Sequence, residues 1–105
     1  MSSIFNDLVF RAQHAVAGKS KAAGHPHWHR FYVELWFTGA HDQDDLTDWI
    51  ESHFKDLQGA NLHMRRKDSS DEGIAHWILA RAQKVHPDCC RVVLRNENRR
   101  GVEVP

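Results

Sequence analysis

At residues 27–37 the chain reads HWHRFYVELWF, and this run decides the fold. Every second residue, from His27 to Phe37, is a histidine or a large apolar residue, and the residues between them are charged or aromatic. A period of two is typical of a β-strand with one buried face. The run therefore predicts a strand over 27–37 whose buried face begins with two histidines, His27 and His29.

A second alternating run lies nearer the N-terminus. Between Ile4 and Val16 the even positions are mostly apolar, whereas polar and charged residues such as Arg11 alternate with them. The same period of two predicts a second half-buried strand. His14 falls on its inward face, so two neighbouring strands offer three imidazoles to one side of a sheet.

The period then changes to that of a helix. One apolar helix face begins near Asp45, and Gly59 suits the cap at its end. Ser69 and Glu72 have the spacing of a capping box at the start of a second helix. Two short strands follow, at 91–97 and 101–104. The order ββααββ predicts an α+β fold, a four-stranded antiparallel sheet with two helices on one face.

Composition limits the class of protein. A chain of 105 residues with 41% hydrophobic content forms one domain, spanning 1–105. Fourteen basic residues balance fourteen acidic ones, which argues against nucleic acid or an anionic membrane as partner. We find neither a leader segment nor eighteen consecutive apolar residues, so we expect a cytoplasmic protein. The adjacent Cys89 and Cys90 are expected to be reduced thiols at the start of a strand.

Aromatic residues also occupy the outer face of the predicted sheet. Trp28, Tyr32 and Trp36 alternate with the inward residues of 27–37, so they point away from the helices. A single chain would leave these rings and the sheet edges in water. We therefore expect a homo-oligomer in which several sheets close into a shared barrel.

The strongest chemical signal is the His-x-His at 27 and 29. Residues two apart on a strand point the same way, about 7 Å apart, so both rings can reach one tetrahedral ion, and His14 can supply a third nitrogen. Three histidines leave one position open, which is typical of catalytic zinc. In a chain with nine histidines such a pair also arises by accident. Placing polar rings at the ends of apolar faces favours metal binding, because their uncompensated burial is costly.

Five short motifs also resemble a known family when they are taken in order. They read FRAQH at 10–14, HWHRFYV at 27–33, LTDW at 46–49, SDEGIA at 70–75 and VVLRNE at 92–97. Together they resemble the successive motifs of the 6-pyruvoyltetrahydropterin synthase and 6-carboxytetrahydropterin synthase family. The resemblance covers nearly the whole chain.

This resemblance implies the tunnelling fold and an assembly of trimers that pair into hexamers. It also implies that His14, His27 and His29 bind zinc and that Glu97 anchors a pterin ring. A carboxylate suits that role because it can accept two hydrogen bonds from the pterin edge. Without the resemblance, an ion pair of Glu97 with Arg95 or Arg99 would be the better interpretation.

The chain departs from the family pattern at its catalytic groups. The family has a cysteine base shortly before the His-x-His, but the segment 20–26 contains no cysteine. The family's Asp-His pair after the first helix aligns with Gln58 and Gly59, or with Leu62 and His63 if the gap is shifted. His25 and His63 are therefore our candidates for proton transfer.

Three functions are compatible with these observations. The first, which we favour, is a zinc-dependent lyase that breaks a carbon-carbon or carbon-oxygen bond of 7,8-dihydroneopterin triphosphate or a related dihydropterin. Its product could be the 6-pyruvoyl or the 6-carboxy compound. The second is a homologue that binds zinc and pterin without catalysis. The third is an unrelated zinc hydrolase in which metal-bound water is the nucleophile.

Overall fold

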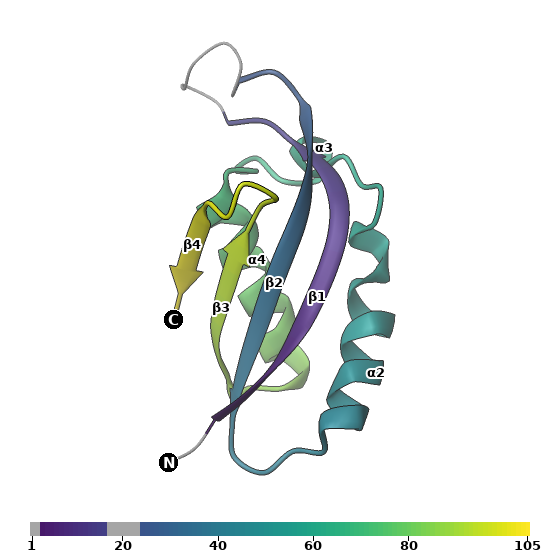
Figure 1. The fold of residues 1–105 in the computed structure, drawn as a ribbon, viewed down its shortest axis with the longest axis vertical. Coiled ribbons are helices and arrows are strands. Elements are labelled where there is room, and N and C mark those ends of the chain that lie inside the picture. The colour runs from purple at the N-terminus through teal and green to yellow at the C-terminus, as the bar shows by residue number, and fades with distance from the viewer. Residues whose placement is uncertain (1–2, 17–23) are drawn as a thin grey trace.

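The computed structural model describes residues 3–16 and 24–105, which form one four-stranded antiparallel sheet with helices against it (Figure 1). The strands lie in the order β1 (Ser3–His14), β2 (His27–Thr38), β3 (Cys89–Arg95) and β4 (Gly101–Val104). The main helices are α2 (Gln43–Phe54) and α4 (Asp71–Val85). The predicted α+β fold is confirmed. The first helix, predicted to end at a cap at Gly59, instead ends at Phe54 and is followed by the 3-10 turn η1 (Lys55–Leu57). The short helix α3 (Leu62–Arg65) was not predicted.

The register of the first two strands decides where the histidines meet. β1 and β2 pair along their whole length, with Ser3 opposite Thr38 at one end and His14 opposite His27 at the other. β3 pairs with the far half of β2, and β4 completes the sheet. Full pairing of two half-buried strands aligns their inward faces. It therefore brings His14 beside the His-x-His of β2.

The core lies between the sheet and the two main helices. Alternate residues of β2 are fully buried, and α4 packs against β3 and β4 while α2 packs against β1 (Figure 1). The largest fully buried side chains are Phe31, Phe37, Phe54, Leu35, Ile50, Leu57, Leu62, Ile74, Ile78, Leu94, Val33 and Val92. Their burial supplies most of the driving force for folding, at roughly 1.5–3 kcal/mol for each large apolar side chain.

The outer face of the sheet carries exposed apolar side chains. Phe5, Val9, Trp28 and Tyr32 have between 39% and 52% of their surface in water. The predicted placement of Trp28 and Tyr32 away from the helices is thus confirmed, and Trp36 is half-buried and stacks on Phe5 on the same face. This face is not one continuous apolar patch, because the charged pairs Asp7–Glu34 and Arg11–Arg30 alternate with the apolar pairs in the register of β1 and β2. The oligomer expected from it stays a prediction.

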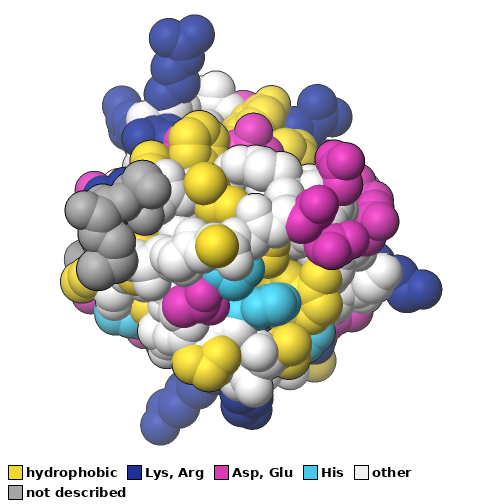
Figure 2. Space-filling model, turned by 90° about the horizontal axis from the view of Figure 1, so that it is seen from below, with side chains coloured by type: hydrophobic (Ala, Val, Ile, Leu, Met, Phe, Trp, Pro, Cys, Tyr) yellow, Lys and Arg dark blue, Asp and Glu magenta, His cyan; other side chains and the backbone are white. Residues whose placement is uncertain are grey.

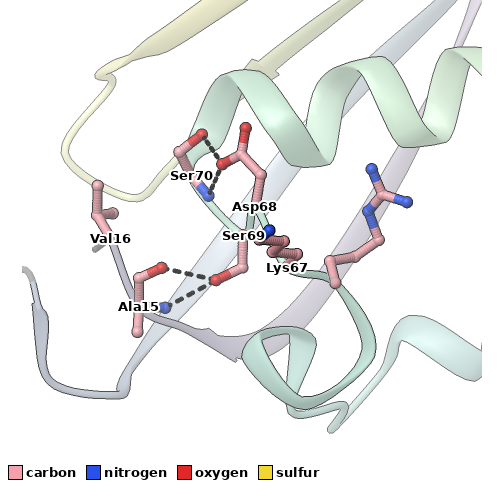
Figure 3. Close-up of a pocket in the computed structure, with 7 residues that line it drawn as sticks. Ala15, Val16, Lys67, Asp68, Ser69 and Ser70 are labelled. Carbon is pink, nitrogen blue, oxygen red and sulfur yellow. Dashed lines mark hydrogen bonds between the residues drawn. The ribbon is translucent and has the colours of Figure 1, made fainter. Parts of the chain in front are cut away.

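The two main helices begin at side-chain caps. The Asp42 carboxylate accepts hydrogen bonds from two backbone N–H groups at the start of α2. At α4 the cap is Ser70, whose hydroxyl accepts from the Gly73 N–H at 3.1 Å. The predicted cap at Ser69 is wrong by one residue. The Ser69 hydroxyl instead bonds the backbone of Ala15, just beyond β1 (Figure 3).

Two further sequence expectations concern the cysteines and the membrane. Cys89 and Cys90 are free thiols at the start of β3, as predicted, and burial raises the pKa of Cys89 to about 12. In the part of the chain described, no helix is both long enough and apolar enough to span a bilayer.

Candidate metal centre

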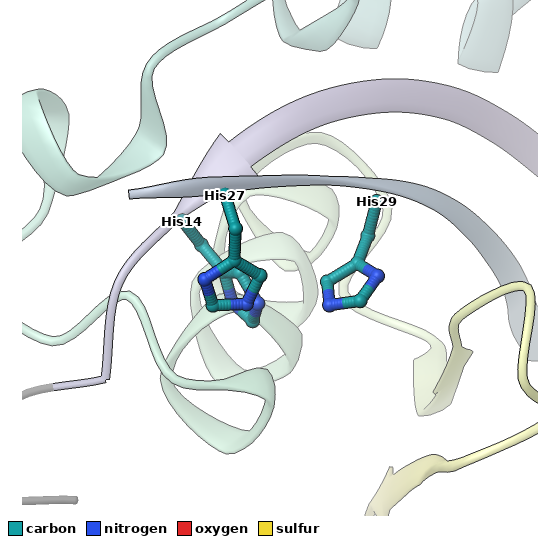
Figure 4. A group of neighbouring side chains, drawn as sticks. All are labelled: His14, His27 and His29. Atoms are coloured by element: carbon teal, nitrogen blue, oxygen red, sulfur yellow. The ribbon is translucent and has the colours of Figure 1, made fainter. Parts of the chain in front are cut away.

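His14, His27 and His29 meet at one end of the sheet, and their rings point to the same side of it (Figure 4). One ligand nitrogen from each lies within 4.8 Å of the others. The ring centroids are 4.5 Å apart for His14 and His27, 5.1 Å for His14 and His29, and 4.9 Å for His27 and His29. Two imidazoles on one tetrahedral ion at 2.0–2.1 Å place their centroids about 5 Å apart. The three rings are therefore spaced to hold one metal ion. We call them the histidine triad.

Each ring of the histidine triad is oriented by an acceptor behind it. The Nδ1 atom lies 2.9 Å from the Ser69 carbonyl in His14, 2.7 Å from the His25 carbonyl in His27, and 2.8 Å from a Glu97 carboxylate oxygen in His29. Carbonyl and ionised carboxylate oxygens only accept, so each Nδ1 carries a proton, and in the neutral ring this leaves the lone pair on Nε2. Metal-binding histidines have the same arrangement of outer partners.

The burial of His14 tests whether a metal fits. His14 is 3% exposed, and its Nε2 has no hydrogen-bond partner among the described residues. A buried nitrogen without a partner costs free energy, which a metal ion would recover. Burial lowers the pKa of His14, and this effect exceeds the opposing effects of the Ser69 carbonyl and Asp71. His14 is thus neutral at pH 7, the form that binds metal. The triad fits zinc or a similar transition metal.

Phe31 supports the triad from the core. It is fully buried two residues after His29 on the same face of β2. Its ring meets those of His14 and His29 edge to face, at centroid distances of 5.4 Å and 5.9 Å. Phe31 also stacks on Phe10 at 5.3 Å. Well-packed rings hold their rotamers, so Phe31 limits the movement of two of the three candidate ligands.

Glu97 follows β3 and reaches back to β2. One carboxylate oxygen accepts from His29 Nδ1, and the other accepts from the Arg30 N–H at 3.0 Å. Partial burial acts to raise the pKa of Glu97, but the hydrogen bond from His29 and the backbone bonds lower it by more. The alternative ion pair with Arg95 or Arg99 is not found among the described residues: Glu97 pairs with His29, and Arg95 pairs with Glu34. The carboxylate also borders a hollow of about 370 Å³, lined with Tyr32, Arg95, Asn96 and Arg99.

The two histidines predicted to transfer protons lie outside the histidine triad. The His25 side chain is exposed, and its backbone carbonyl orients His27. His63 is half-buried on α3, and its Nδ1 is buried with no partner among the described residues. Asn61, just before α3, pairs with Gln13 beside His14, which keeps α3 at this end of β1. His63 thus lies on a helix at the triad's end of β1, and His25 lies two residues before His27 in the chain.

Gln58 and Gly59, which the sequence places opposite the family's Asp-His pair in one of two alignments, extend the edge of β1. The Gly59 N–H donates to the Arg11 carbonyl at 2.7 Å, and the Gln58 side-chain oxygen accepts from the Arg11 N–H at 3.0 Å. Gly59 has φ +76, a conformation that favours glycine. These residues serve strand pairing here and present no acid-base group.

A second hollow, of about 560 Å³, lies between the segment that follows β1 and the segment that precedes α4 (Figure 3). It is lined by Ala15, Val16, Arg66, Lys67, Asp68, Ser69 and Ser70. Its connection to the triad is Ser69, whose carbonyl accepts from His14. The Asp68 carboxylate is held by Ser70, whose hydrogen bonds lower its pKa. Arg66 and Lys67 are thus the side chains in this hollow that suit an anion.

Histidine side chains also gather on the face at the opposite end of the molecule (Figure 2). His41 donates from Nε2 to the Thr38 carbonyl and to the Asp88 carboxylate, and its ring centroid is 6.0 Å from that of His86. Within residues 3–16 and 24–105, the histidine triad alone satisfies the geometry of a shared metal. The His41–Asp88 contact instead ties the connection after β2 to the start of β3.

Some of these contacts have no signal in the sequence. Two outer partners of the histidine triad lie far along the chain from the rings they contact. Ser69 is 55 positions from His14, and Glu97 is 68 positions from His29. The resemblance singles out Glu97 as a pterin anchor, but nothing in the spacing indicates its bond to His29. The sequence also contains no indication that Asp71 lies beside the triad, with one carboxylate oxygen 3.7 Å from His14 Nδ1.

Comparison with known proteins identifies a solved structure that has a similar fold. No protein-family model and no curated protein matches the sequence. Among solved structures, that of 6-pyruvoyl tetrahydropterin synthase from Caenorhabditis elegans matches with a TM-score of 0.79. The match covers 98% of this chain and 94% of that chain, at 13% sequence identity. The chain therefore has the same fold as that synthase.

Proposed function

We propose that this protein is a zinc-dependent lyase acting on 7,8-dihydroneopterin triphosphate or a related dihydropterin. The observation that carries the proposal is the convergence of one ring nitrogen from each of three histidines within 4.8 Å, in a fold shared with a tetrahydropterin synthase. A similar fold alone does not fix a reaction. The donor set and its surroundings supply the chemical argument.

His14, His27 and His29 would hold the ion and leave one position open. Zinc bound there would supply Lewis acidity, lowering the pKa of a substrate hydroxyl so that its proton can leave at neutral pH. The protein's own contribution is orientation, because the acceptors at Ser69 and Glu97 fix two of the rings before any ligand arrives.

The two hollows beside the histidine triad suit the two ends of such a substrate. On one side, Glu97 can accept N–H groups of the pterin edge with the lone pairs that its contacts to His29 and Arg30 leave free. On the other side, Arg66 and Lys67 can pair with phosphate oxygens. A dihydropterin with a phosphorylated side chain would span the ion between them.

Proton transfer needs a group to replace the missing cysteine and Asp-His pair. We assign it to His63 or His25. His63 has the stronger support, since its buried Nδ1 lacks a partner among the described residues and α3 lies beside β1 near His14. An imidazole is suited to the role because its usual pKa lies near the operating pH.

Assembly into a trimer or hexamer is part of the proposal. The exposed face with Phe5, Val9, Trp28 and Tyr32 would be covered if sheets from several copies closed into a barrel. Light scattering of purified protein tests this, and a monomer at micromolar concentration would contradict it.

The test of function combines metal analysis with product detection. Purified protein should contain about one zinc ion per chain, and incubation with 7,8-dihydroneopterin triphosphate should give a product seen by mass spectrometry. The product should disappear in His63→Ala or His25→Ala while zinc is retained. Pterin affinity without product would instead establish the non-catalytic binder. Ester hydrolysis without pterin affinity would establish the hydrolase and overturn the proposal.

A further inference from the structure

Glu97 has a second role besides the one proposed for it toward a pterin. We infer that Glu97 is a positioning residue for the metal, acting through His29. The inference rests on the proposed metal centre, and it concerns metal affinity in the absence of any pterin. Its basis is the 2.8 Å contact between a Glu97 carboxylate oxygen and His29 Nδ1.

The contact has the geometry of a carboxylate behind a metal-binding imidazole. His29 uses Nδ1 to donate to Glu97, so its Nε2 is the nitrogen that faces His14 and His27. An anionic acceptor fixes the ring orientation and increases the electron density at the opposite nitrogen. His14 and His27 have backbone carbonyls as acceptors. Glu97 is therefore the one charged acceptor hydrogen-bonded to the histidine triad within the described part of the chain.

The carboxylate is held in place before a metal binds. Its second oxygen accepts from the Arg30 N–H, so β2 fixes both oxygens with consecutive residues. The turn that carries Glu97 is anchored by the buried Asn96, whose side-chain oxygen accepts from the backbone N–H groups of Asn98 and Arg100. A preorganised acceptor orients His29 without paying for its own ordering at the moment of binding.

Asp71 provides an internal comparison. One of its oxygens is 3.7 Å from His14 Nδ1, and that oxygen is buried with no partner among the described residues. At 3.7 Å the contact is too long for a hydrogen bond, and His14 Nδ1 already bonds Ser69. Asp71 can therefore act on the metal only through its charge. Its removal should weaken metal binding less than removal of Glu97.

This dual role affects how Glu97 variants must be tested. If Glu97 both supports zinc and receives the pterin edge, its loss lowers pterin binding by two routes. Pterin affinity must therefore be compared at saturating zinc, and zinc affinity must be measured without pterin. The two measurements separate failure of this inference from failure of the proposed function.

The experiment is a zinc competition against a chromophoric chelator, with no pterin present. We expect Glu97→Ala to bind zinc about 10- to 100-fold more weakly than wild type. Glu97→Gln keeps an acceptor oxygen but loses the charge, so its loss should be smaller. Asp71→Asn should lose less than Glu97→Ala. The control is Glu103→Gln, whose native partner is Arg91 on the neighbouring strand, and it should bind as wild type.

A spectroscopic readout separates positioning from loss of fold. Cobalt bound in place of zinc should show an altered ligand-field spectrum in Glu97→Ala, while circular dichroism stays unchanged because the Glu97 side chain is 42% exposed. Zinc affinity of Glu97→Ala within twofold of wild type would overturn the inference and leave the metal centre standing. A wild-type chain that binds no zinc would overturn both.

Discussion

Two phenylalanines of β2 allow the metal centre to be separated from general stability. Phe31 and Phe37 are both fully buried on the same face of the strand, and each contacts two histidine rings. Phe31 contacts His14 and His29 of the histidine triad, whereas Phe37 contacts histidines at the other end of the sheet. Phe31→Leu and Phe37→Leu therefore make similar cavities in opposite halves of one strand.

The expected loss of stability follows from burial. A Phe→Ala change in a core costs about 3–5 kcal/mol, and leucine refills most of that space, which leaves about 1–2 kcal/mol. Phe31 also loses its stacked pair with Phe10 at 5.3 Å, worth about 0.5–1.5 kcal/mol. We expect Phe31→Leu to lose about 2 kcal/mol and Phe37→Leu slightly less. In a domain of this size, 1 kcal/mol shifts Tm by about 4–8 °C.

The expected effect on zinc differs much more. Leucine cannot hold the edges of two imidazoles, so Phe31→Leu should weaken zinc binding about tenfold, at the low end for loss of an outer partner. Phe37→Leu should bind zinc as wild type. Thermal unfolding of the metal-free proteins measures the first quantity, and chelator competition measures the second. Equal zinc affinities in the two variants would refute the role given to Phe31, even if both were destabilised as expected.

Three further predictions concern the metal, an ion pair and a helix cap. Zinc at about 100 times its Kd should stabilise the protein by about 2.7 kcal/mol, which corresponds to a rise in Tm of about 10–20 °C. In a thermal melt, His27→Ala should abolish most of that rise. Burial acts to raise the pKa of Asp56, but hydrogen bonds from Arg81 and Arg65 lower it by more. The stability that this carboxylate contributes is therefore fully present above its unfolded pKa of about 3.9. It is lost as the pH falls through the lower pKa of the folded protein. Asp56→Asn should therefore be less stable by about 0.5–1 kcal/mol at pH 7, with the difference vanishing near pH 2 in urea titrations, and a constant difference across that range would contradict the ion-pair argument. Ser70→Ala should cost about 1 kcal/mol through loss of the α4 cap, and an unchanged urea midpoint would show that the cap contributes nothing.

The parts of the fold that the sequence predicts are those encoded by neighbouring residues. The alternation in 27–37 is a local property, and it places His27, His29 and Phe31 on one face before any tertiary contact is known. Pairing of β1 with β2 is limited by the same alternation, because a slip of one residue would turn the buried face of one strand to the other side of the sheet. The triad could be predicted for this reason.

The contacts behind the histidine triad could not be predicted in the same way. Ser69 and Ser70 are both able to cap α4, and the choice depends on which hydroxyl forms hydrogen bonds to another part of the chain. The Ser69 hydroxyl bonds the backbone of Ala15, so Ser70 is the cap. The bond from His29 to Glu97 joins residues 68 positions apart. This hydrogen bond forms only because the turn held by Asn96 places Glu97 beside β2. Neither the periodicity nor the composition of the sequence predicts that placement.

The three outer partners come from three different segments of the chain. His14 is held by the residue before the α4 cap, His27 by the segment before β2, and His29 by the turn after β3. A metal on the histidine triad would therefore join not only β1 to β2 but also the positions of these three connections. Because binding energy gained in the native state alone adds to folding stability, zinc should protect all three segments from local opening, and not only the strands that carry the ligands. Amide hydrogen exchange can measure this: slower exchange confined to β1 and β2 would mean that the outer partners are not energetically linked to the metal.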